Sequence, residues 1–138
     1  MEAIYTAVAT ASGDGRNGHS RTSDGLLDVD VRIPKEMGGT GGATNPEQLF
    51  AAGYAACFHS ALKAAARGTD ADLEGTEITT RVSIGRIDNG GFGLAVELDL
   101  YAPELEAGMA QELLDKAHQL CPYSNAIRGN VEVQLRLI

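Results

Sequence analysis

The sequence has no long hydrophobic run, little positive charge and only two cysteines, and each shortage excludes a class of protein. No uncharged stretch approaches the roughly 18 apolar residues that a membrane-spanning helix needs. The first residues, Met1 to Ile4, lack the basic and then apolar segment that opens a secretory signal peptide. We therefore expect a cytoplasmic protein that does not associate with membranes.

The shortage of positive charge limits the partners of the chain. Lysine and arginine number 11 against 19 acidic residues, which gives a net charge of -8 at pH 7. This charge repels phosphate backbones and anionic lipid headgroups, so we expect no nucleic-acid partner. The content of 43% hydrophobic and 22% charged residues is that of a soluble globular protein, and 138 residues suit one domain over the whole chain, 1–138.

The pattern of apolar residues predicts an α+β fold in which strands outnumber two long helices. Partial or full alternation predicts strands over residues 3–11, 26–33, 77–87, 92–101 and 131–138. Residues 12–25 are rich in Gly, Asp, Asn and Ser and are predicted to form a turn or loop, and residues 88–91 to close a hairpin. Helical spacing predicts helices over about 44–66 and 103–120.

The two cysteines are the candidate reactive groups, because cytosolic thiols are normally kept reduced and disulfide bridges there tend to be transient or catalytic. Cys57 lies in the middle of the first predicted helix, and Cys121 lies where Pro122 ends the second. A cysteine on an alanine-rich helix is more often a small buried hydrophobe than a nucleophile. To react, Cys57 must be a thiolate, which a positive charge nearby would stabilise. Arg16 and Arg21 are both candidates for that charge, although a loop arginine is by default a solvated surface residue.

Glu47 is subject to a distance constraint. It precedes Cys57 by ten residues on the same predicted helix, which corresponds to about 15 Å of rise. Glu47 therefore does not touch the thiol of its own chain, and a shared site would need a second subunit or an intermediary residue. Alternatively, Glu47 interacts only with the dipole at the helix N-terminus.

A structural zinc site is the main alternative among the cysteines and histidines. The pairs Cys57-x-His59 and His118-x-x-Cys121 supply four candidate ligands. However, Cys57 and His59 lie about 200° apart around a helix and would not face one ion, so we expect no metal. The chain also has no Cys-x-x-Cys pair of the thioredoxin type, and the glycine-rich residues 38–42 do not match a phosphate-binding loop.

Two long motifs carry a family resemblance. They are Asn-Pro-Glu-Gln-Leu-Phe-Ala-Ala-Gly-Tyr-Ala-Ala-Cys-Phe over residues 45–58 and Cys-Pro-Tyr-Ser-Asn-Ala over residues 121–126. Both resemble the cysteine motifs of the organic hydroperoxide resistance (Ohr) proteins of the OsmC/Ohr superfamily. The similarity extends over essentially the whole chain, including residues 38–44, 90–94 and 128–130. It implies an OsmC/Ohr-like fold, with an antiparallel-rich sheet and two long helices, in an intertwined homodimer with its sites at the subunit interface.

The resemblance also implies roles for four residues. Cys57 would be the peroxidatic cysteine and Cys121 the resolving cysteine. Arg16 would stabilise the thiolate and polarise the peroxide, and Glu47 would hold that arginine. Counting back from Ser-Asp-Gly at residues 23–25 selects Arg16, and Arg21 stays the alternative.

The implied reaction is the reduction of small organic hydroperoxides, alkyl or lipid, to alcohols. A Cys57 sulfenic acid would be captured by Cys121 as a disulfide, and dihydrolipoamide on lipoylated protein subunits would reduce it, with no bound cofactor. The apolar residues Leu49, Phe50 and Phe58 would line the substrate pocket. The alternative is a non-enzymatic dimer of the same fold that binds a hydrophobic ligand, with both cysteines inert. A zinc-stabilised structural protein is the third hypothesis.

Overall fold

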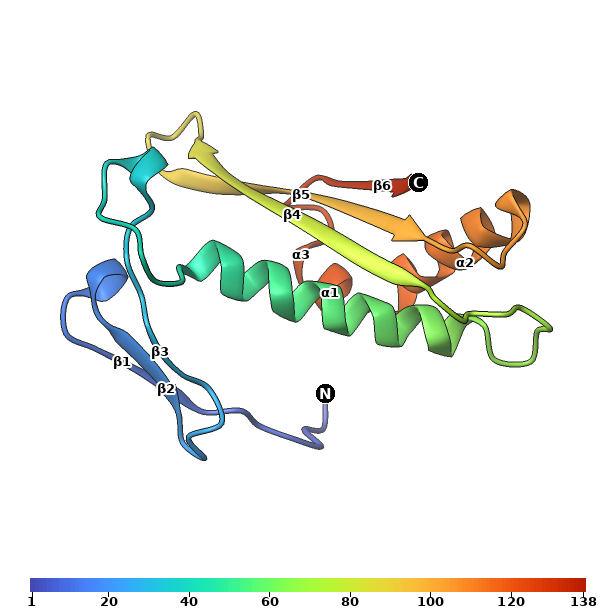
Figure 1. The fold of residues 1–138 in the computed structure, drawn as a ribbon, viewed down its shortest axis with the longest axis horizontal. Coiled ribbons are helices and arrows are strands. Elements are labelled where there is room, and N and C mark those ends of the chain that lie inside the picture. The colour runs from blue at the N-terminus through green and yellow to red at the C-terminus, as the bar shows by residue number, and fades with distance from the viewer. The chain divides into compact units, whose positions relative to one another are not determined.

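A computed structural model describes residues 1–138, and the chain divides into two compact units, Met1–Leu49 and Phe50–Ile138. Each unit contains one three-stranded sheet (Figure 1). The architecture is α+β, as the sequence predicts. None of the helices combines the length and the apolar composition that a membrane crossing requires.

The N-terminal unit is built on a small antiparallel meander. Its strands pair in chain order, and the unit also holds two short 3-10 helices. The strands are β1 (Ala9–Ser12), β2 (His19–Thr22) and β3 (Asp28–Asp30), and the 3-10 helices are η1 (Gly15–Asn17) and η2 (Lys35–Met37).

The predicted strands of this unit needed correction. The prediction of a loop over 12–25 missed β2, because its sequence His-Ser-Arg-Thr has no apolar alternation and its strand geometry depends on the ladders to β1 and β3. The predicted strands 3–11 and 26–33 are shorter in the structure, since only residues with ladder partners stay in strand geometry.

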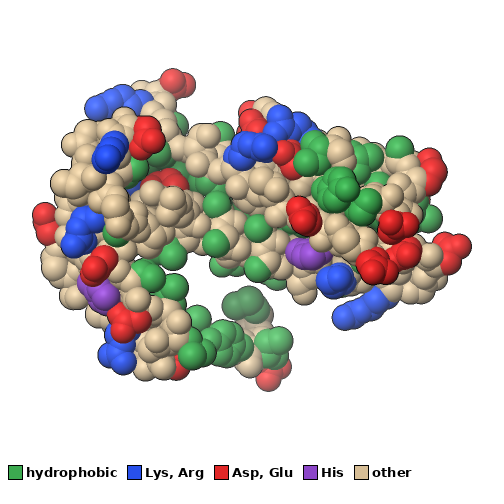
Figure 2. Space-filling model, in the orientation of Figure 1, with side chains coloured by type: hydrophobic (Ala, Val, Ile, Leu, Met, Phe, Trp, Pro, Cys, Tyr) green, Lys and Arg blue, Asp and Glu red, His purple; other side chains and the backbone are tan.

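The N-terminal unit has almost no buried core of its own. All four residues of β1 are exposed, and Val31 is its one buried hydrophobic side chain. Near the start of the chain, Ile4 has a relative exposure of 101% and Tyr5 one of 79%. Figure 2 shows that hydrophobic side chains lie on the surface of the protein. A small sheet without a buried hydrophobic face contributes little stability by itself.

The long helix α1 (Pro46–Ala65) begins as the sequence predicts. The side-chain oxygen of Asn45 accepts the backbone N–H of Gln48 at 2.9 Å, and Pro46 at the first helical position has no N–H to satisfy. The buried residues along the helix recur at a spacing of three or four and form one face of the core. They are Tyr54, Phe58, Ala61, Leu62 and Ala65.

The sheet of the C-terminal unit contains β4 (Glu77–Arg86), β5 (Phe92–Tyr101) and β6 (Val133–Leu137) in the order β4-β5-β6. The β4–β5 pair is the predicted hairpin, in antiparallel register, whereas β6 pairs with β5 in parallel. Alternate residues of β5 supply the core: Val96, Leu98 and Leu100 are fully buried.

Two helices precede the last strand. α2 (Ala107–Leu120) starts four residues later than predicted, because the Glu106 carboxylate caps the backbone N–H groups of the first turn. The short helix α3 (Pro122–Ile127) was not predicted. Cys121 has extended backbone dihedrals (φ -66°, ψ 123°) between α2 and α3, and Pro122 starts α3, so the proline predicted to stop one helix also starts the next.

Candidate active site

The two cysteines, 64 residues apart in sequence, meet in the C-terminal unit. Cys57 lies within α1, and Cys121 lies at the junction of α2 and α3. Their Sγ atoms are 3.5 Å apart, within hydrogen-bonding distance for sulfur, and both thiols are free. Because a disulfide bond is about 2.05 Å long, a shift of about 1.5 Å would let the two sulfurs bond.

The environments of the two thiols differ. Cys121 has no exposed surface, whereas Cys57 is half-buried. Burial raises the pKa of the Cys57 thiol, and the backbone N–H of Tyr123 acts in the opposite direction by stabilising the thiolate. Only Cys57 is thus open to a dissolved reagent.

An open pocket of about 340 Å³ lies beside Cys57 in the C-terminal unit. Apolar and small side chains from α1 and from the α2–α3 junction surround it. The lining residues are Cys57, Ser60, Ala61, Ala64, Leu120 and Pro122. The volume suits a small organic molecule.

The hydrophobic residues predicted to line the pocket do not line this one. Phe58 is fully buried in the core with Leu62, because it lies on the inner face of α1. Phe50 packs its ring against Tyr123, with centroids 5.9 Å apart. Leu49 is half-buried at the end of the N-terminal unit.

Arg16 and Glu47 form a pair within the N-terminal unit. Both terminal guanidinium nitrogens of Arg16 donate to the two carboxylate oxygens of Glu47, each at 2.8 Å. These bonds hold the pKa of Glu47 below its usual value and raise the pKa of Arg16. The alternative arginine, Arg21, instead lies 3.6 Å from the Asp28 carboxylate.

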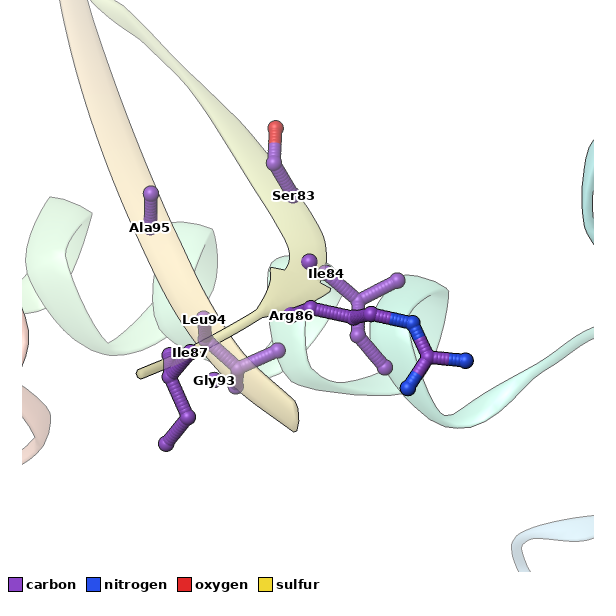
Figure 3. Close-up of a pocket in the computed structure, with 8 residues that line it drawn as sticks. Ser83, Ile84, Arg86, Ile87, Gly93, Leu94 and Ala95 are labelled. Carbon is purple, nitrogen blue, oxygen red and sulfur yellow. The ribbon is translucent and has the colours of Figure 1, made fainter. Parts of the chain in front are cut away.

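A second concavity, of about 240 Å³, lies at the end of the β4–β5 hairpin that carries the connecting loop (Figure 3). Its labelled residues come from β4, from β5 and from the loop between them, and Arg86 is its one charged residue. It contains no cysteine or histidine, so we regard the pocket beside Cys57 as the candidate active site.

The four residues considered as zinc ligands have other partners. His59 Nε2 forms a hydrogen bond with Thr76 Oγ1 at 2.9 Å, and His118 Nδ1 forms one with Ser124 Oγ at 2.9 Å. No three His, Cys, Asp or Glu side chains are grouped so as to hold a metal ion.

The sequence reasoning missed two polar side chains near the cysteines. Tyr54 and Ser124 are fully buried and bond to each other at 2.7 Å. Their sequence signal was a hydroxyl three residues from each cysteine, on faces that are otherwise apolar.

Comparison with known proteins identifies the family. A family model described as OsmC-like protein matches residues 39–136. An organic hydroperoxide resistance protein of Xanthomonas axonopodis pv. citri is 54% identical over 136 residues, covering 97% of this chain and 94% of that protein. The organic hydroperoxide resistance protein OhrB of Bacillus subtilis is 48% identical, covering 98% of each chain.

The solved structures agree with the sequence matches. An organic hydroperoxide resistance protein from Legionella pneumophila superposes with a TM-score of 0.93 at 52% identity, over 99% of this chain and 98% of that one. The chain therefore belongs to the OsmC-like family. The relatives and the solved structure described above all bear the name organic hydroperoxide resistance protein.

Proposed function

We propose that this protein is a cysteine-based peroxidase that reduces organic hydroperoxides to alcohols in the cytoplasm. The observation that carries the proposal is the 3.5 Å separation of the Cys57 and Cys121 sulfurs, with one thiol beside an open pocket and the other buried. The names of the relatives support the choice of organic hydroperoxides as substrates.

The first half of the cycle oxidises Cys57. Its thiolate attacks the terminal oxygen of the hydroperoxide, the O–O bond breaks, and the alkoxide leaves as an alcohol after taking up a proton. Cys57 becomes a sulfenic acid. Arg16, held by Glu47, supplies the positive charge that the thiolate and the departing oxygen need. The family resemblance implies this role for Arg16, and its two bonds to Glu47 support the proposal.

The second half restores the thiols. The Cys121 thiolate attacks the Cys57 sulfenic sulfur, hydroxide leaves as water, and a Cys57–Cys121 disulfide forms. Dihydrolipoamide, carried on lipoylated protein subunits, then reduces this disulfide and becomes the cyclic disulfide itself. The difference in burial supports the assignment of roles, because only Cys57 borders the pocket that a peroxide would enter.

The test is a peroxidase assay with tert-butyl hydroperoxide and dihydrolipoamide that follows consumption of both. We expect turnover by the wild type and none above background by Cys57→Ser. Cys121→Ser should complete the first oxidation and then accumulate overoxidised Cys57. Many turnovers by Cys121→Ser without overoxidation would contradict the resolving role.

One observation favours the alternative, a non-enzymatic dimer that binds a hydrophobic ligand. Burial raises the pKa of Cys57, which is typical of an inert cysteine. Thiol titration of the reduced protein separates the two functions. The peroxidase requires a Cys57 pKa below the free-cysteine value of about 8.5, and the binding protein requires one above it.

We also propose that the protein is a homodimer. The N-terminal unit leaves β1 and the apolar side chains of Ile4 and Tyr5 exposed, and a second copy would cover such a surface. Light scattering coupled to size-exclusion chromatography tests this. A mass of twice 14.4 kDa is expected, and a monomer at all concentrations would refute it.

A further inference from the structure

A chain of hydrogen bonds joins the three helices that surround the cysteines. Tyr54 of α1 bonds through its hydroxyl to Ser124 Oγ of α3 at 2.7 Å, and Ser124 Oγ bonds to His118 Nδ1 of α2 at 2.9 Å. Tyr54 and Ser124 have no exposed surface, and His118 is half-buried. A buried, satisfied chain of this kind holds its elements in one arrangement.

Each member of the chain lies three residues from a cysteine. Tyr54 precedes Cys57 on α1, and His118 and Ser124 flank Cys121 on either side of the α2–α3 junction. Residues three apart on a helix lie on neighbouring parts of its surface. The hydrogen bonds therefore tie the part of α1 that carries Cys57 to the junction that carries Cys121.

Aromatic packing supports the same contact. The rings of Tyr54 and Tyr123 lie 5.6 Å apart between centroids. Gly53 also allows α1 to approach the junction, because a side chain there would come within 2.9 Å of the Tyr123 hydroxyl. Packing brings the helices together, and the hydrogen bonds fix their register.

The protonation state of His118 bears on which group donates in each of these hydrogen bonds. Burial and the charge of Arg128 lower the pKa of His118, against an opposing effect of Asp115, so its ring is neutral at pH 7. With the ring proton on Nε2, His118 Nδ1 accepts from the Ser124 hydroxyl, and Ser124 Oγ accepts from the Tyr54 hydroxyl. The reverse direction would leave the buried Tyr54 O–H with no acceptor, which costs about 1–3 kcal/mol.

We infer that Tyr54, Ser124 and His118 are positioning residues for the Cys57–Cys121 disulfide, keeping the second sulfur at attack distance from the first. They raise the effective concentration of one thiol at the other without touching the peroxide. The consequence for catalysis depends on the proposed peroxidase function, whereas the effect on the disulfide does not.

In the peroxidase cycle, this positioning decides the fate of the Cys57 sulfenic acid. Capture by Cys121 competes with a second peroxide, which would oxidise the sulfenic acid to sulfinic acid. A looser junction slows the capture and leaves the first oxidation unchanged. The sulfinic form of Cys57 should then accumulate at lower peroxide concentrations.

The primary measurement needs no peroxide. The protein is equilibrated with reduced and oxidised dithiothreitol, and the fraction with a Cys57–Cys121 disulfide is read by alkylation and mass spectrometry. We expect Ser124→Ala and His118→Leu to make the disulfide easier to reduce by about tenfold, or about 30 mV. His118→Asn should shift the disulfide equilibrium much less than His118→Leu, because the amide oxygen of the new side chain can accept from Ser124.

Two matched controls separate this role from general packing. His59→Asn changes another half-buried histidine, whose partner is Thr76, and Tyr101→Phe removes the hydroxyl of an exposed tyrosine. Both should leave the equilibrium within about twofold of the wild type. The second readout is the peroxide concentration that gives half overoxidation of Cys57, which should fall in Ser124→Ala and not in the controls.

The outcomes are distinguishable from failure of the proposed function. A protein without peroxidase activity but with the tenfold shift supports the positioning role alone. If folded Ser124→Ala and His118→Leu both keep the wild-type equilibrium, or if the controls shift equally, the inference is overturned. If Ser124→Ala fails to fold, His118→Leu decides the test, because His118 is the half-buried member of the hydrogen-bond chain.

Discussion

In the C-terminal unit Cys121 has no exposed surface, whereas in the N-terminal unit 37% of the Arg16 side chain is exposed. The sulfur pair is held by a hydrophobic core and a buried hydrogen-bond chain. The guanidinium is held by two bonds to Glu47. The two units thus position their candidate catalytic groups by packing in one case and by a charge pair in the other, so substitutions should affect the two units differently.

The largest expected effect is on folding stability. Phe58→Ala empties a fully buried position in the C-terminal core and should lower the free energy of unfolding by about 3–5 kcal/mol. Arg16→Gln removes a partly exposed ion pair and should cost less than about 1 kcal/mol. Urea unfolding followed by circular dichroism measures both, and equal losses would contradict the contrast between the units.

The next effect is on activity, where a substitution of Arg16 in the N-terminal unit should have a large effect despite its small cost in stability. In the proposed mechanism, Arg16→Lys should lower kcat/KM for tert-butyl hydroperoxide by about 10- to 100-fold, because an ammonium group cannot make the two-pronged contact with Glu47. Arg21→Lys is the matched control, since Arg21 pairs with Asp28. A larger loss in Arg21→Lys would assign the catalytic role to Arg21 instead.

A smaller effect concerns acid stability. The pKa of Asp99 lies below its usual value because Arg136 and then Arg81 bond to it. A lowered pKa adds stability above the unfolded-state value of about 3.9, and this stability is lost as the pH falls through the folded-state value. Asp99→Asn should therefore be less stable than the wild type at pH 7, and the difference should narrow below about pH 4.

The control for acid stability lies in the N-terminal unit. The pKa of Glu47 is also lowered, by Arg16, so its contribution has the same sign. The Glu47 side chain is 13% exposed, whereas that of Asp99 is 2% exposed. The stability difference between Glu47→Gln and the wild type should therefore narrow less at low pH than the difference for Asp99→Asn. Unfolding midpoints measured from pH 3 to 7 provide the comparison. If the stability difference between either variant and the wild type widened at low pH, the lowered pKa of that carboxylate would be contradicted.

The sequence predicted the C-terminal unit better than the N-terminal one for a physical reason. Strands such as β5 bury alternate residues, and α1 buries one face, so their patterns are visible without coordinates. β2 has no apolar face, and its strand geometry depends on the ladders to β1 and β3. A strand without an apolar face leaves no periodic signal in the sequence.

The candidate site shows the same limit. Cys57 and Cys121 could be paired as candidates from their number and from the family resemblance, but their 3.5 Å separation needed the fold. The contribution of Tyr54 and Ser124 was not predicted, because the position of a hydroxyl three residues from a cysteine does not identify its hydrogen-bond partner until the fold is known. The lining of the substrate pocket was predicted from the apolar residues near Cys57. Phe58, one of these residues, packs in the hydrophobic core and does not line the pocket beside Cys57.

The smallest expected effect, that of salt, compares the two units directly. Raising the NaCl concentration from about 0.1 M to about 1 M shortens the screening length from about 10 Å to about 3 Å. Because Arg16 is partly exposed, kcat/KM should fall by about twofold. The Cys57–Cys121 equilibrium with dithiothreitol should not change, since apolar packing and neutral hydrogen bonds position the two sulfurs. Potassium phosphate at matched ionic strength controls for chloride binding. If salt shifts the disulfide equilibrium as much as it shifts kcat/KM, then charge rather than packing positions the cysteines, and the contrast between the units is lost.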